Sequence, residues 1–151
     1  MAVTLFSPTA NTTTLYPLEM LQHNSIVITN CVIDVTSAVA HTIDVGLYVL
    51  DWNNKTIARL SGSTVTHNCA TIGVKNATLP GEVTLLPRQQ YFVGVNPTGS
   101  VSLRSYGHTC SIYTVAGTSL SALVPISSKA AKTRVMMPWV EFLSKKGNEV
   151  L

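Results

Sequence analysis

Two His-x-Cys pairs are the residues whose types and spacing come closest to those of a metal site. His67 and Cys69 form one pair, and His108 and Cys110 form the other. Residues i and i+2 of a strand face the same side, so two neighbouring strands would bring the four side chains together as a Cys2His2 zinc site. The alternatives are a disulfide between Cys69 and Cys110 and ordinary buried thiols. We favour buried thiols, because with Cys31 the cysteines are odd in number and cannot all pair within the chain.

Motifs of nucleophilic or phosphate chemistry do not occur in the sequence. There is no Gly-x-Ser-x-Gly elbow, no phosphate loop and no dinucleotide fingerprint. The acidic residues are scattered. The two inside expected strands, Asp34 and Asp44, alternate with apolar residues and are expected to face solvent or to lie at a sheet edge. We therefore expect a protein that is not an enzyme, with no cofactor and no metal.

The segment Trp52-Asn53-Asn54 is a candidate carbohydrate contact. An exposed indole stacks on the apolar face of a sugar ring, and neighbouring amides bond its hydroxyl groups. The alternative, which we favour at this point, is that Trp52 folds back onto the rim of the domain.

The length and composition of the chain indicate its number of domains and the distribution of its charge. The 151 residues are enough for one domain, and only 11% of them are charged against 46% that are hydrophobic. Residues 1–128 carry no net charge, so the whole formal charge of +3 falls in residues 129–151. Such a basic segment suits an acidic protein surface or a phosphate backbone, or is simply solvated. We expect no sequence-specific nucleic-acid binding, no membrane span and no signal peptide.

Period-2 patterning predicts that the chain is all-β. Short apolar runs are separated by turn residues at intervals typical of a sandwich, and we expect a two-sheet antiparallel β-sandwich of the jelly-roll type. The predicted strands cover residues 25–39, 41–51, 55–60, 64–74, 82–86, 90–95, 101–106 and 110–115.

The two ends of the chain are less regular than its middle. We expect an N-terminal arm over residues 1–20, a sandwich over residues 21–128 and a basic, apolar C-terminal arm over residues 129–151. Extended arms often pair with a neighbouring subunit, whereas this apolar arm could also pack on its own core. The candidate assembly residues of the C-terminal arm are Arg134, Met136, Met137, Trp139, Phe142 and Leu143.

Four runs of the sequence resemble β-sandwich modules of tailed-bacteriophage virion proteins. They are residues 45–51 (VGLYVLD), 55–60 (KTIARL), 83–87 (VTLLP) and 90–95 (QYFVGV), although Arg88 stands where the pattern has glycine after the proline. The resemblance implies a structural protein of the virion, made in the host cytoplasm. With the two arms it favours a capsid decoration (cement) protein that binds the major capsid protein as a homo-oligomer, most simply a trimer. The alternative is a tail fibre or baseplate adhesin that binds host-surface carbohydrate.

Overall fold

The computed structural model describes residues 9–18 and 24–144. Within these ranges the chain forms β strands and one 3-10 turn. They are β1 (Thr12–Pro17), β2 (Ile26–Ser37), β3 (Thr42–Asp51), β4 (Thr56–Arg59), β5 (Val65–Asn68), β6 (Gly73–Leu85), β7 (Tyr91–Pro97), β8 (Ser102–Leu103), β9 (Ser105–Cys110), β10 (Tyr113–Ala116), β11 (Leu123–Pro125), η1 (Ile126–Ser128), β12 (Thr133–Pro138) and β13 (Val140–Ser144).

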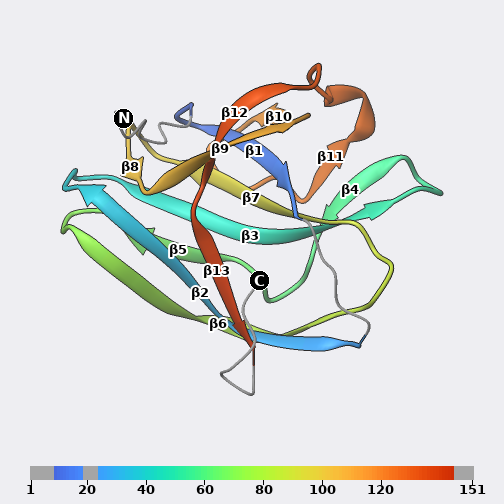
Figure 1. Cartoon of the computed structure of the whole chain (residues 1–151), viewed down its shortest axis with the longest axis horizontal. Coiled ribbons are helices and arrows are strands. Elements are labelled where there is room, and N and C mark those ends of the chain that lie inside the picture. Colours follow the sequence, from blue (N-terminus) through green and yellow to red (C-terminus); the bar gives the residue numbers. More distant parts are fainter. Residues whose placement is uncertain (1–8, 19–23, 145–151) are drawn as a thin grey trace.

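The strands form a large sheet, a small sheet and a two-stranded ribbon, all with antiparallel pairing (Figure 1). The large sheet has the order β10-β1-β7-β3-β4-β11, and β5 pairs with the part of the β3 edge that β4 leaves open. The small sheet has the order β13-β2-β6, and β8 also pairs with β2. The ribbon of β9 and β12 continues from the small sheet, where the Trp139 N–H donates to the Arg104 carbonyl at 2.8 Å.

The main core lies between the two sheets. It joins fully buried side chains of the small sheet, such as Ile33 and Phe142, to others of the large sheet, such as Val45 and Val95. Burial of this apolar surface is the dominant stabilising contribution, at about 1.5–3 kcal/mol for each large side chain. The predicted all-β fold of packed antiparallel sheets is confirmed.

A second core lies on the other face of the large sheet. Leu15, Tyr48 and Phe92 meet Leu120 there, beneath a segment that we call the strap (residues 117–122). The strap is fixed by hydrogen bonds: the buried Asn96 side chain donates to the Gly117 and Ser119 carbonyls at 2.9 Å each, and the Tyr48 hydroxyl donates to the Ser121 carbonyl at 2.6 Å. Strands β7 and β3 are therefore largely buried on both faces.

A β-bulge in β2 explains a change of phase in its sequence. Ile26 and Ile28 fall on even positions, whereas Cys31 and Ile33 fall on odd ones, which in a regular strand would place the two pairs on opposite faces. The register with β6 shifts between Ile28 and Asn30, and all four apolar side chains point into the main core. The irregularity at Thr29, which stands opposite four residues of β6, thus turns an apparent two-faced pattern into a single buried face.

The segments expected to be arms are, over their described parts, strands of the domain. β1 lies inside the large sheet between β10 and β7, although Thr12–Pro17 fell in the predicted N-terminal arm. At the other end of the chain β12 pairs with β9, and β13 pairs with β2. The predicted boundary at residues 20/21 lies outside the described residues, and the paired strands β12 and β13 follow the predicted boundary at residues 128/129. Backbone pairing with distant strands leaves little trace in the local sequence.

Gly94 occupies a position where a side chain does not fit. A Cβ atom there would lie 2.3 Å from the Tyr48 ring and 2.8 Å from the Leu15 side chain. We expect Gly94→Ala to lower the free energy of unfolding by roughly 1–3 kcal/mol through overpacking. Urea denaturation measures this, and Gly117→Ala is the matched control, because an added Cβ meets its nearest neighbour only at 3.7 Å. Equal midpoints for both variants would contradict the packing of the second core.

Candidate functional site

The two His-x-Cys pairs do not converge. His67 belongs to β5 in the large sheet and Cys69 follows it directly, whereas His108 and Cys110 belong to β9 in the ribbon. Among residues 9–18 and 24–144, no group of three or more His, Cys, Asp or Glu side chains could hold a metal ion. The zinc site considered from the sequence is therefore not formed by these four residues, because the two strands are not neighbours.

All three cysteines are free and buried. Burial raises the pKa of Cys31, and it also raises the pKa of Cys69 and Cys110, where Lys75 and Lys132 respectively oppose the shift. Because the thiolate is the nucleophile and the metal ligand, these thiols are held in their unreactive form. The geometry agrees with the favoured interpretation and not with a Cys69–Cys110 disulfide.

His67 is a buried histidine with one unsatisfied nitrogen. Its side chain is 3% exposed, and Nε2 has no hydrogen-bond partner among the described residues. Burial lowers the pKa of His67, because the charged imidazolium loses its hydration. In the folded protein burial therefore favours the neutral form of the His67 side chain, which belongs to β5 at the edge of the large sheet.

Acid is expected to destabilise the protein through His67. Below about pH 6.5 the unfolded chain binds a proton that folded His67 rejects, so the free energy of unfolding falls by up to about 1.4 kcal/mol per pH unit from this group. His67→Leu should reduce the difference in stability between pH 7 and pH 5, measured by urea denaturation at both values. An unchanged difference would show that His67 binds its proton equally well in the folded and unfolded chain, which would contradict the effect of burial.

The hairpin that joins β3 to β4 extends past the ends of the sheets (Figure 1). Trp52 lies in the turn of this hairpin. Its side chain is 73% exposed, so the expectation that it folds back onto the rim is wrong. Asp51 closes the turn: its Oδ1 accepts from the backbone N–H groups of Asn53 and Asn54 at 3.0 and 3.2 Å. With the turn closed by these two bonds, the Trp52 indole remains exposed to solvent.

The turn is further ordered by its own side chains. Asn54 Nδ2 donates to Asp51 Oδ2 at 2.7 Å, and this bond, with the two backbone bonds, lowers the pKa of Asp51. This bond uses one N–H of the Asn54 amide and leaves its second N–H and its Oδ1 for a ligand. Of the three candidate carbohydrate contacts, Asn54 is the one whose side chain also helps to close the turn.

A second loop lies at the same end of the molecule. The Leu50 N–H donates to the Gln90 carbonyl at 2.9 Å, which places the β6–β7 turn beside the base of the Trp52 hairpin. Leu86 is exposed in this turn, and Arg88 has φ of 65°. We call residues 52–55 and 86–90 together the hairpin end. It combines an indole, an aliphatic side chain, amides and one guanidinium group.

Leu86 and Arg88 were not recognised from the sequence as site residues. The available signal was the departure from the phage pattern, since Arg88 stands where glycine is expected. Its left-handed backbone is the conformation that glycine adopts most easily. A non-glycine residue held there is uncommon and often marks a functional position.

The candidate assembly residues separate into two groups. Met137 is 3% exposed and Phe142 is 0% exposed, so both belong to the main core of their own chain. The others reach the surface: Arg134 is exposed, and Met136, Trp139 and Leu143 are half-buried. Arg104 lies over the Trp139 ring at 5.4 Å, a cation–π contact that covers part of the indole.

Comparison of the chain with protein-family models, with curated proteins and with solved structures gives no significant match. Within the described residues, none of the helical segments has the length and apolar character needed to cross a membrane.

Proposed function

We propose that this chain is a non-enzymatic structural protein of a virus particle, and that it binds host-surface carbohydrate as a module of a tail fibre or baseplate. The observation that carries the proposal is Trp52, which is 73% exposed at the tip of an ordered turn. The virion origin rests on the resemblance of residues 45–95, and the non-enzymatic character rests on the lack of catalytic motifs in the sequence.

The chemistry of the hairpin end supports carbohydrate binding. Sugar rings present apolar C–H faces and hydroxyl edges, which fit an indole beside amides and a guanidinium group. The Asp51 bonds hold the turn in one conformation before binding. Pre-ordering reduces the entropy lost when the ligand binds.

Capsid decoration, with the major capsid protein as partner and a trimer as the simplest oligomer, is the second candidate. The arms that favoured it are strands of the domain, and this removes most of its support. What favours it is a separate apolar site at the start of β6, where Ile72 in the preceding loop is 66% exposed and Val74 in the strand is 64% exposed. A decoration protein would bury such side chains against the shell.

Antibody-gold labelling of intact particles from the source tests both roles. Label confined to the tail would support the carbohydrate-binding module, and binding to a glycan array should then follow. Label distributed over the head would support decoration and overturn the tail assignment. Particles that carry no label would contradict the virion origin itself.

A further inference from the structure

The ribbon of β9 and β12 is rich in positive charge. Between Glu82 and Glu141 the sequence has no acidic residue but five basic ones, which are Arg88 and four residues of the ribbon and its extensions. The four are all exposed, and we call them the basic strip: Arg104, Lys129, Lys132 and Arg134. The hairpin end includes none of them.

Backbone pairing places the basic strip along one line. β9 and β12 lie side by side in antiparallel register (Figure 1). The pairing extends past both ends of the ribbon, because the Trp139 N–H donates to the Arg104 carbonyl at 2.8 Å and Lys129 forms a β-bridge with Tyr113. Arg104 and Tyr113 are nine positions apart in the sequence. The four cations are therefore distributed over a length of up to about 30 Å.

Two guanidinium groups of the strip are held in place by their neighbours. Arg104 lies over the Trp139 ring, 5.4 Å from its centroid. Arg134 lies against the backbone of Gly107, where a Cβ atom would come within 2.8 Å of the Arg134 Cζ. The bare backbone of Gly107 thus provides the space in which the guanidinium group rests. A group that is positioned before binding loses less entropy when it pairs with an anion.

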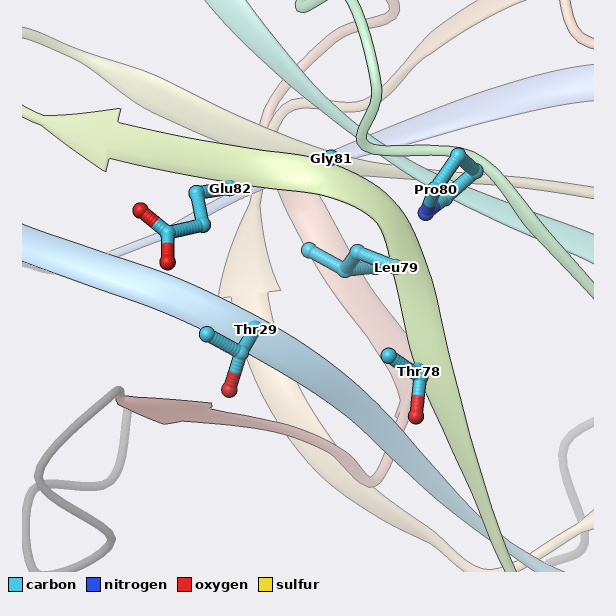
Figure 2. A pocket seen from close by; sticks show the side chains of 6 residues that line it. All are labelled: Thr29, Thr78, Leu79, Pro80, Gly81 and Glu82. Carbon is cyan, nitrogen blue, oxygen red and sulfur yellow. The ribbon is translucent and has the colours of Figure 1, made fainter.

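The nearest acidic residues lie at one end of the basic strip or away from it. The Arg104 N–H donates to the Asp34 carbonyl at 2.9 Å, so Asp34 and Glu141, on the paired strands β2 and β13, lie toward the Arg104 end. Glu82 extends from β6 beside Thr29 (Figure 2), at the far end of the β2–β6 pair from Asp34. The other three cations are exposed on segments that carry no acidic residue.

We propose that the basic strip binds a linear polysaccharide that carries carboxylate or sulfate groups. A row of cations matches anions that repeat along a polymer, and each guanidinium group can pair with two oxygens of one anion. Thr109 stands directly opposite Arg134 and is exposed, so its hydroxyl can bond a sugar hydroxyl beside the paired anion. The site goes beyond the proposed function, because it is separate from Trp52 and its ligand is charged.

The aromatic rings near the strip favour a polysaccharide over a single-stranded nucleic acid. Nucleic acids also carry repeated anions, but their single strands bind through bases that stack on open aromatic faces. Arg104 already lies over the Trp139 ring. Tyr106 pairs with Met137, which is buried in the main core, so Tyr106 belongs to the face of the ribbon opposite Gly107. The strip therefore presents charges without an aromatic surface for stacked bases.

Calorimetric titration of the full chain tests the proposal. The probes are heparin, which is sulfated, and polygalacturonate, which is carboxylated, with dextran as the neutral comparison and single-stranded oligodeoxythymidylate as the nucleic-acid comparison. We expect saturable binding of at least one anionic polysaccharide and none of dextran. The affinity should fall at least about tenfold between about 50 mM and about 200 mM NaCl, because several cations displace counterions. Absence of binding to both anionic polysaccharides, equal binding of dextran, or tighter binding of the oligonucleotide overturns the proposal.

Variants separate the basic strip from the net charge of the protein. Arg134→Gln should weaken the affinity by at least about fivefold, and Arg134→Lys by less, because lysine keeps the charge and loses the two-fold contact. Lys75→Gln is the matched control: it removes the same charge from β6, where the Lys75 ammonium donates to Thr71, and should change the affinity by less than about twofold. Equal losses in Arg134→Gln and Lys75→Gln, or no loss in Arg134→Gln, would overturn the site. A loss in Trp52→Ala would assign the binding to the hairpin end.

Discussion

Replacing Phe142 with alanine is expected to lower the free energy of unfolding by about 3–5 kcal/mol, the usual cost of removing a buried phenyl ring. The side chain is 0% exposed and belongs to the main core, on a strand that pairs with β2. Domains of this size are stabilised by only about 5–15 kcal/mol, so the variant should unfold at a much lower denaturant concentration. Urea denaturation followed by tryptophan fluorescence measures the shift.

Leu143→Ala is the matched control for Phe142→Ala. Leu143 is the next residue along β13 and is half-buried, so its truncation should cost clearly less than that of Phe142. If residues 129–151 formed an assembly arm, both variants would instead weaken an oligomer and leave the unfolding midpoint of the monomer unchanged. That result, measured by sedimentation together with denaturation, would contradict the placement of β13.

Replacing Trp52 with alanine is expected to weaken glycan binding by about 30-fold, which corresponds to the loss of about 2 kcal/mol for a central aromatic contact. The unfolding midpoint should stay close to that of the wild type, because the side chain is 73% exposed and contributes little to the core. Binding to the glycans selected on an array, measured by calorimetry, gives the affinity of both proteins.

Leu123→Ala is the control for the change at Trp52. Leu123 is another exposed apolar side chain, on β11, and it lies outside the hairpin end. Its removal should leave glycan binding intact. Unaltered binding after Trp52→Ala, or an equal loss after Leu123→Ala, would contradict the assignment of carbohydrate recognition to the hairpin end.

Strands with strong local patterning were predictable from the sequence. Residues 41–51 alternate regularly and end in polar turn residues, and the structure has β3 there, joined to β4 by a tight hairpin. The phase change between Ile28 and Cys31 is compatible with either a long or a bulged strand, and the register shift in β2 lies between Ile28 and Asn30. Residues 64–74, by contrast, were predicted as one strand but contain the whole of β5 and the first two residues of β6, with a bend at Ala70 and Thr71 between them.

Strands held mainly by distant partners were missed. Thr12–Pro17 has polar threonines and a terminal proline, and it forms a strand because β10 and β7 flank it. Residues 133–144 were predicted to belong to an arm because their pattern is less regular than that of the middle of the chain. Neither partner is near in sequence, so no local pattern could indicate the pairing.

The sequence by itself determined that the chain is all-β, that it is rich in apolar residues and poor in charged ones, and that Trp52 lies at a hairpin tip. These features follow from composition, alternation and turn residues, which act over a few residues. Only the tertiary structure decided that the two His-x-Cys pairs lie apart, that Phe142 is core and not interface, and that Thr29 stands opposite four residues of β6. These outcomes depend on which distant segments pair, and pairing is set by the packing of the whole chain.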